Sequence, residues 1–202
     1  SGYREEGYYP EAVINFLAWL CCHATGDQEM YTMQELIEQF SLERVSKSGA
    51  KFDYEKGKWF NHQYLQLKSN EELAEQFMPI LDTKLSTLNT KPSLETVAKV
   101  IGLTKDRVNF VSELWEQVNF FFVAPTEYDE KSLKKRWKED SPKHMTEMLS
   151  LLEAHEDWSA EGLDNLIMPW IAEKEYGVGI VMNAFRICLV GAARGPHIWN
   201  IT

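Results

Sequence analysis

Apolar residues recur at helical spacing along most of the chain, and many of these segments begin at a residue that caps helices. After Pro10, which suits a first helical turn, apolar residues follow at intervals of three or four: Val13, Phe16, Leu17 and Leu20. Further helix starts are indicated at Asp53, Asn70, Ser93, Thr104, Asp129, Ser141 and Ser159. No segment alternates apolar and polar residues between hairpin turns, so we predict an all-α fold.

Local signals also indicate how these helices begin and end. Thr32 and Glu35 have the spacing of a capping box, in which each side chain bonds the other residue's backbone amide. Pro169 is expected to kink or shorten the helix after Ser159, and Gly177 with Gly179 marks a turn before the last helix. Soft boundaries near residues 68–70 and 124–126 predict three packed modules: 1–69, 70–125 and 126–202.

The composition fits a core-forming protein and provides little for metal chemistry. With 202 residues, 44% of them hydrophobic, the chain is long enough to bury a sizeable core. Its longest apolar stretches are shorter than the roughly 20 residues that span a bilayer, so we expect no membrane partner and a cytoplasmic location. Cys21 and Cys22 are adjacent, Cys188 is distant, and the five histidines lack metal-ligand spacing. We therefore expect no disulfide framework and no metal site.

The net charge of −10 argues against a nucleic-acid partner until its distribution is considered. Residues 177–202 contain Arg186 and Arg194 and no acid, so a basic face on an acidic body is possible. The basic run Lys134–Lys138 is flanked by Asp129, Glu130, Glu139 and Asp140, which favours a salt-bridged helix surface. Charge alone leaves both a nucleic-acid binder and a protein-binding scaffold open.

The most informative segment runs from Glu43 to Leu65. In it, a Ser-Lys-Ser-Gly turn comes directly before an aromatic helix that Asp53 can cap. Phe52-Asp53, Trp59 and Asn61 form a Phe-Asp…Trp-x-Asn pattern. In order and spacing, this segment resembles the C-terminal half of bacterial-type glutamyl-tRNA synthetases.

A second string strengthens the resemblance near the end of the chain. The run Ala184-Phe-Arg-Ile-Cys-Leu-Val-Gly191, followed by Gly195-Pro196, resembles a Pro-Leu-Arg-x-Ala-Leu-Thr-Gly string of the same family. The chain departs from the family at Cys21-Cys22, where Gly-Trp is usual, and at Met168, where the family has an arginine. The resemblance covers essentially the whole chain.

The resemblance implies that residues 1–69 form a stem-contact module that follows the catalytic domain, and that residues 70–125 and 126–202 form two anticodon-binding subdomains. The string Val45-Ser-Lys-Ser48 lacks the leading lysine of the catalytic signature loop, so it is interpreted as part of the stem-contact module. Its proposed tRNA stem contacts are Ser46, Lys47, Ser48 and Lys51.

The resemblance also places five residues around the anticodon: Arg107, Arg186, Gly195, Pro196 and Ile198. Arginine stacks on unpaired bases and bonds their edges, while a Gly-Pro turn lets backbone approach a nucleotide closely. Trp199 is the tryptophan whose neighbours favour an RNA contact.

The function implied is recognition of glutamate tRNA within a glutamate–tRNA ligase, whose full length uses ATP and Mg²⁺. This chain would hold no catalytic residue or cofactor and would be inactive alone. No heptad seam calls for assembly, so we expect a monomer. A helical protein-interaction scaffold is the alternative, and binding that weakens steeply with salt would separate the two. A small helical enzyme is disfavoured because no His, Cys and carboxylate constellation emerges.

Overall fold

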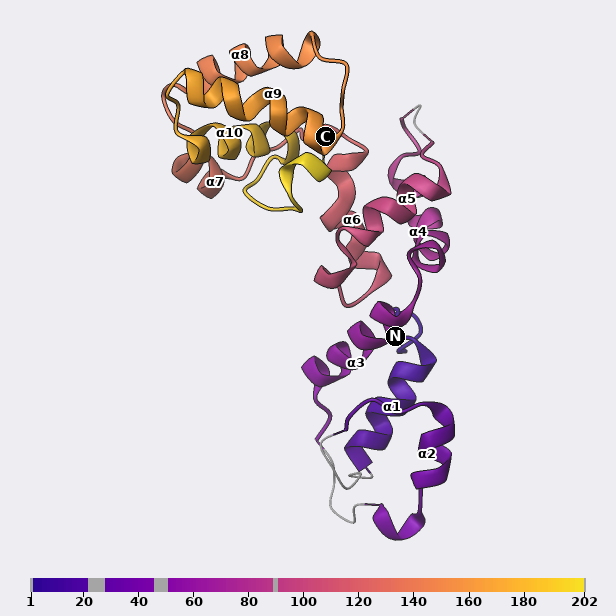
Figure 1. Cartoon of the computed structure of the whole chain (residues 1–202). Coiled ribbons are helices and arrows are strands. Elements are labelled where there is room, and N and C mark those ends of the chain that lie inside the picture. Colours follow the sequence, from indigo (N-terminus) through magenta and orange to yellow (C-terminus); the bar gives the residue numbers. More distant parts are fainter. Residues whose placement is uncertain (1, 22–27, 46–50, 89–90, 202) are drawn as a thin grey trace. The chain divides into compact units, whose positions relative to one another are not determined.

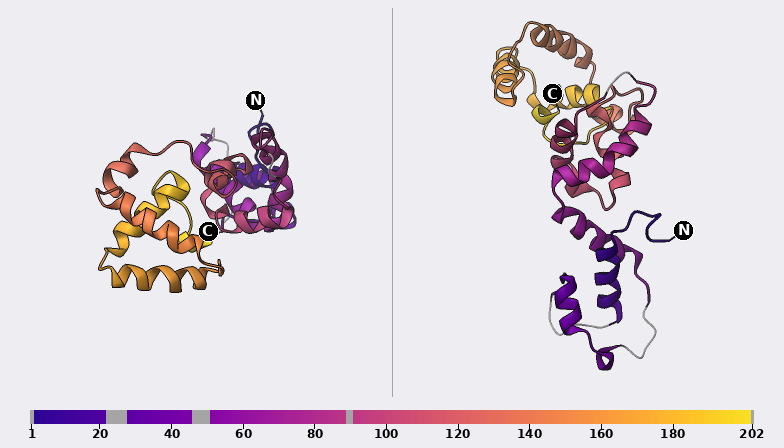
Figure 2. Two further views of the ribbon diagram at one scale, coloured as in Figure 1. Left: turned by 90° about the horizontal axis from the view of Figure 1, so that it is seen from above. Right: turned by 90° about the vertical axis from the view of Figure 1, so that its right-hand side faces the viewer.

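The computed structural model describes residues 2–21, 28–45, 51–88 and 91–201. Every regular element in these ranges is a helix, which confirms the all-α prediction. The chain divides into two compact units, Ser1–Glu116 and Gln117–Thr202. Both are assembled from short helices joined by turns, as the ribbon views show (Figures 1 and 2).

Helices of the first unit pack chiefly as two pairs, α1 with α3 and α4 with α5 (Figure 1). The α-helices are α1 (Pro10–Cys21), α2 (Met33–Gln39), α3 (Tyr54–Leu67), α4 (Asn70–Lys84) and α5 (Leu94–Gly102), and the 3-10 turns are η1 (Leu42–Arg44), η2 (Lys105–Arg107) and η3 (Val111–Glu113). The boundary between the units, after Glu116, lies within the short helix α6 (Leu114–Val118).

The second unit is arranged around α10, which packs against α7, α8 and α9. Its elements are η4 (Asn119–Phe121), α7 (Glu130–Arg136), α8 (Ser141–Glu153), α9 (Ala160–Glu173), α10 (Val178–Val190) and η5 (Ile198–Asn200). Because α10 contacts three other helices, residues at its C-terminal end are attached to a rigid scaffold.

Most helix starts lie where their capping residues predict them. The Thr32 hydroxyl accepts a hydrogen bond from the Glu35 amide at 3.2 Å, and Glu35 accepts one from the Thr32 amide at 2.7 Å, so the capping box is confirmed. Asp53 accepts from the amide of Lys56 at 3.1 Å and begins α3. Each bond satisfies an amide that has no partner inside its helix.

Two local expectations differ from the structure. Helical spacing after Thr104 predicts a continuous helix, yet the chain forms η2, an extended link, η3 and α6. The link is held by other partners, because Asn109 donates its amide to the Glu113 carboxylate at 2.7 Å and its carbonyl accepts from Asn61. Pro169 does not end its helix, because α9 continues through it to Glu173.

Asn61 joins three segments of the first unit. Its side chain is fully buried on α3, accepts from the Tyr9 amide at 2.8 Å and donates to the Asn109 carbonyl at 2.6 Å. Phe16 of α1 and Phe60 of α3 pack beside it with ring centroids 5.8 Å apart. The buried amide therefore fixes which residues of α1 and α3 face each other.

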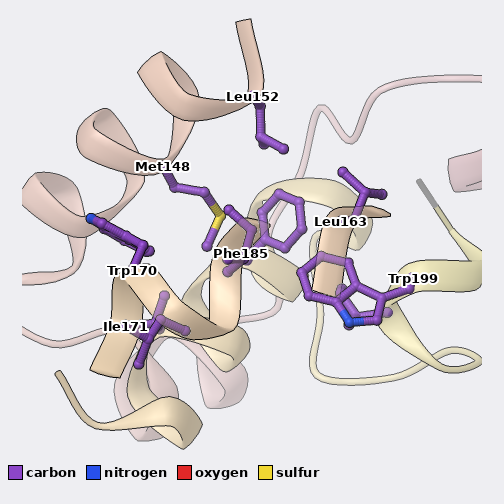
Figure 3. Packing of buried hydrophobic residues seen from close by; sticks show 10 residues of the cluster. Met148, Leu152, Leu163, Trp170, Ile171, Phe185 and Trp199 are labelled. Atoms are coloured by element: carbon purple, nitrogen blue, oxygen red, sulfur yellow. The ribbon is translucent and has the colours of Figure 1, made fainter. Parts of the chain in front are cut away.

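The core of the second unit lies between α8, α9, α10 and η5 (Figure 3). Met148 and Leu163 are almost inaccessible, and Phe185 of α10 lies 6.1 Å from Trp199 between ring centroids. The buried cluster comprises Met148, Leu152, Leu163, Ile167, Trp170, Ile171, Val181, Phe185, Ile198 and Trp199. This core anchors both ends of the segment that follows α10.

Candidate nucleic-acid interface

The segment Gly191–Pro196, here called the α10 loop, begins with a backbone conformation that requires glycine. Gly191 caps α10 with φ +77°, in the left-handed region. A Cβ at this position would lie 2.6 Å from the Glu127 carbonyl oxygen. The chain can therefore leave the helix in this direction only because Gly191 has no side chain.

Hydrogen bonds attach the start of the α10 loop to α7. The Asp129 amide donates to the Gly191 carbonyl at 2.8 Å, and the Ala193 amide donates to the Ser132 hydroxyl at 3.0 Å. A cavity of about 530 Å³ lies beside these bonds and is lined by Glu127, Tyr128, Asp129, Ser132 and residues 190–194. This volume is large enough to hold a nucleotide-sized group.

Arg186 braces the end of the α10 loop. From its position on α10, it donates from Nη1 to the Arg194 carbonyl at 3.2 Å and to the Pro196 carbonyl at 2.8 Å. The guanidinium is half-buried, which strengthens bonds that water would otherwise weaken. Arg186 therefore sets the shape of the loop in addition to any contact with a ligand.

Gly195 and Pro196 form a tight turn within the second unit. Gly195 has φ +109°, and a Cβ there would lie 3.3 Å from Phe120 Cζ and 3.5 Å from Arg186 Nη1. Pro196 is buried. The structure thus brings Arg186, Gly195 and Pro196 together, as the sequence pattern indicates.

Ile198 and Trp199 follow this turn but face inward. Ile198 is 5% exposed and Trp199 6% exposed, both within the core. The Trp199 indole donates to the Asp164 carboxylate at 2.8 Å. A nucleotide contact through the Trp199 ring is therefore not supported, and Ile198 could reach a ligand through its backbone only.

Arg107 belongs to the first unit, in η2. It is exposed and lines a cavity of about 240 Å³ with Glu55, Lys58, Trp59, His62, Asp106 and Asn109. Its Nε lies 3.9 Å from the Asp106 carboxylate, while a hydrogen bond with Glu55 raises the pKa of Lys58. The cations around this cavity thus have acidic neighbours. Arg107 and Arg186 are therefore separate elements of the candidate interface.

The proposed stem-contact string is only partly described. Ser46, Lys47 and Ser48 lie outside the described residues, whereas Lys51 is exposed just before the Asp53 cap of α3. Over the described ranges, no group of three or more His, Cys, Asp or Glu residues is arranged to hold a metal ion. Likewise, no helix in the described part is long and apolar enough to cross a membrane.

The basic run Lys134–Lys138 differs from expectation. Flanking acids favour a salt-bridged helix surface, yet none of Lys134, Lys135, Arg136 or Lys138 forms an ion pair with another described residue. Asp129 instead accepts from the Ser132 amide at 2.7 Å, and hydrogen bonding to the side chain and then the backbone of Ser132 holds the pKa of Asp129 below its usual value. The acid is used to begin α7, and the lysines extend into solvent.

Comparison with known families agrees with this arrangement. Residues 72–202 match the family described as "Anticodon binding domain", a range that contains Arg107, Arg186 and the whole α10 loop. Residues 1–59 match the family described as "tRNA synthetases class I (E and Q), catalytic domain".

Individual relatives show the same likeness over the full chain. A glutamate–tRNA ligase of Bacteroides thetaiotaomicron is 56% identical over 202 residues, and that of Flavobacterium johnsoniae is 46% identical over 201. A crystal structure of a glutamate tRNA ligase from Elizabethkingia meningosepticum, in complex with its amino acid, superposes with a TM-score of 0.88 at 40% identity and matches the whole chain. In each case the chain spans 39% of the relative's length.

Proposed function

The chain belongs to the glutamate–tRNA ligase family, in which it corresponds to the C-terminal, anticodon-binding region, and we propose that it binds the anticodon loop of glutamate tRNA. The observation that carries the proposal is the braced turn at Arg186, Gly195 and Pro196 within the matched domain. Such a turn presents backbone groups in a fixed geometry, which suits recognition of unstacked bases.

The braced turn supports base recognition in two ways. Gly195 has φ +109°, a backbone conformation that residues with a side chain rarely adopt, so glycine permits this bend beside Arg186. Arg186 keeps the Arg194 and Pro196 carbonyls in place before RNA arrives, so little ordering is needed on binding. Ile198 would contribute its backbone, because its side chain is in the core.

Charge distribution fits this role despite the acidic body. Residues 177–202 carry Arg186 and Arg194 without any Asp or Glu, which favours the approach of phosphates to this segment, while Glu127 and Asp129 line the α7 side of the neighbouring cavity. Arg107 would add a second contact from the first unit. Bases would supply selectivity and phosphates most of the affinity.

The family resemblance also supports a finer division of the chain into three modules. Residues 1–69 would form the stem-contact module, with Ser46, Lys47, Ser48 and Lys51 on the tRNA stem, and residues 70–125 and 126–202 the two anticodon-binding subdomains. Correct anticodon contacts would speed a distant reaction by positioning the acceptor end.

The whole ligase would act in the cytoplasm, join glutamate to its tRNA and use ATP with Mg²⁺. This chain alone would be an inactive monomer. ATP–pyrophosphate exchange measured with the chain alone tests this point: no glutamate-dependent exchange is expected, and measurable exchange would contradict it.

Binding to two RNAs tests the central proposal. The chain is titrated into fluorescein-labelled glutamate tRNA and into an anticodon-substituted copy, with anisotropy read at low and moderate salt. We expect tighter binding of the native anticodon and weaker binding of both RNAs as salt rises. Equal affinity for the two RNAs would refute anticodon recognition by this chain.

A further inference from the structure

The helix α7 carries a concentration of positive charge that its own fold does not use. Residues 131–138 hold five of the chain's 21 basic residues, and none of the five forms an ion pair with a described residue. Lys56, Lys58 and Lys99 of the first unit, by contrast, each pair with a glutamate. Four of the five lie on the seven-residue helix α7, and in a chain of net charge −10 such a local excess of positive charge favours an anionic partner.

Helix stability explains only a part of this charge. Lys134, Lys135 and Arg136 lie in the last turn of α7, where one or two cations stabilise the helix dipole by about 0.3–1 kcal/mol. Lys131 lies near the opposite end, where a cation is unfavourable to the dipole, although it helps to lower the pKa of Asp129. The excess of charge in the last turn remains available for a ligand.

The position of α7 connects this charge to the α10 loop. Ser132 accepts from the Ala193 amide at 3.0 Å, so the Ser132 side of α7 faces the loop. The two helices pack together, and Figure 1 shows α7 beside α10 in the second unit. Arg136 lies four residues after Ser132, which is about 6 Å along the helix axis. Successive phosphates of a stacked strand rise by about 3.4 Å, so this separation corresponds to about two nucleotides.

Helical geometry separates the basic residues by direction. With 3.6 residues per turn, Arg136 points about 40° and Lys135 about 60° from Ser132, whereas Lys134 points about 160° away. Lys135 and Lys134 are both exposed, and Arg136 is half-buried. Lys135 and Arg136 therefore face the side of the α10 loop, and Lys134 faces the opposite side.

We propose that Lys135 and Arg136 bind RNA backbone phosphates one or two nucleotides from the base held at the α10 loop. This inference rests on the anticodon-binding function and adds the path of the RNA strand across α7. Arg136 bonds phosphate oxygens in a fork, and Lys135 acts as a point charge. These contacts hold the strand in register and carry no sequence information.

Charge reversal at two neighbouring positions tests the proposal. Lys135→Glu and Lys134→Glu change the net charge equally, on the same helix, at two exposed lysines without ion pairs. Lys135→Glu is expected to weaken tRNA binding about tenfold at low salt, whereas Lys134→Glu changes it about twofold or less. Equal effects of the two substitutions, or no effect of either, would overturn the proposal.

Neutral variants measure the phosphate contact itself. Lys135→Gln should reduce the slope of log affinity against log salt by about 0.7, the value for one lost contact to single-stranded nucleic acid. The preference for the native anticodon should remain unchanged. If the wild-type chain shows no anticodon preference, the proposed function is wrong. If the wild-type chain shows that preference but Lys135→Gln has the same salt slope as wild type, only the proposed RNA path across α7 is wrong.

Discussion

Arg186 donates a hydrogen bond from Nη1 to the carbonyl of Pro196 at 2.8 Å, ten residues later in the chain. The family resemblance places the same arginine at the anticodon. In the structure it also closes the α10 loop, because Nη1 bonds the Arg194 carbonyl as well. Substitution at this position must therefore affect the loop as well as any bound base.

Arg186→Ala is expected to weaken binding of glutamate tRNA and to lower the free energy of unfolding of the second unit by about 1 kcal/mol, because one half-buried and one exposed hydrogen bond are lost. Arg186→Lys should restore only a part of the affinity, since lysine keeps the charge without the planar fork. Anisotropy and urea unfolding measure the two effects. Unchanged affinity in Arg186→Ala would remove this residue from the site.

Gly191→Ala is expected to destabilise the second unit by about 1–3 kcal/mol, since alanine is strained at φ +77° and its Cβ would lie 2.6 Å from the Glu127 carbonyl oxygen. Gly179→Ala is the matched control on the same helix, because its Cβ meets nothing closer than 4.0 Å. Alanine there should be neutral or stabilising. Thermal unfolding of the two variants tests this expectation. Similar melting temperatures for Gly191→Ala and Gly179→Ala would contradict the left-handed conformation of Gly191.

Asn61→Ala is expected to cost about 2–4 kcal/mol in the first unit, because it leaves the Tyr9 amide and the Asn109 carbonyl without their partner. Gln63→Ala, on the same helix and only half-buried, serves as control. Hydrogen exchange at the Tyr9 amide gives a local measurement. Protection of that amide should fall in Asn61→Ala, and retained protection would show that another group replaces the asparagine.

Tyr9 gives the first unit a pH dependence on the alkaline side. Burial raises the pKa of Tyr9 to about 12, with Glu11 and Glu72 adding to the effect, whereas an unfolded tyrosine titrates near 10. Between these values the unfolded chain releases a proton that the folded chain keeps. The stabilisation is therefore complete below pH 10 and is lost as pH rises through 12.

Urea unfolding of wild type and Tyr9→Phe, compared between pH 9 and 12, tests this expectation. The urea midpoint of wild type should fall relative to that of Tyr9→Phe as pH rises, because phenylalanine has no proton to release. Other groups that titrate in this range are common to both proteins. Parallel curves would show that Tyr9 titrates normally.

The sequence by itself determined the features that depend on residues close together in the chain. A capping box such as Thr32 with Glu35 needs only two side chains three residues apart, so the pattern predicts both the bond and the helix start. The same holds for Asp53, Asp129 and Ser159, whose side chains each bond an amide three residues on. The all-α fold follows from these local signals and from the 3.6-residue period.

The family motifs also grouped three residues that lie together in the structure. Arg186, Gly195 and Pro196 lie within a short stretch, and the structure brings them into one braced turn. Their spacing could not show that Arg186 bonds the loop itself, because that bond depends on where α10 ends and how Gly191 turns the chain.

Tertiary structure decided what depends on distant partners. Trp199 resembles a surface tryptophan by its neighbours, but it packs in the core of the second unit, where Asp164, 35 residues earlier, accepts its indole N–H. The helix expected after Thr104 is interrupted because Asn61, 48 residues earlier, bonds the Asn109 carbonyl. In both cases the hydrogen-bond partner is far away in the sequence, and only the folded chain brings it close.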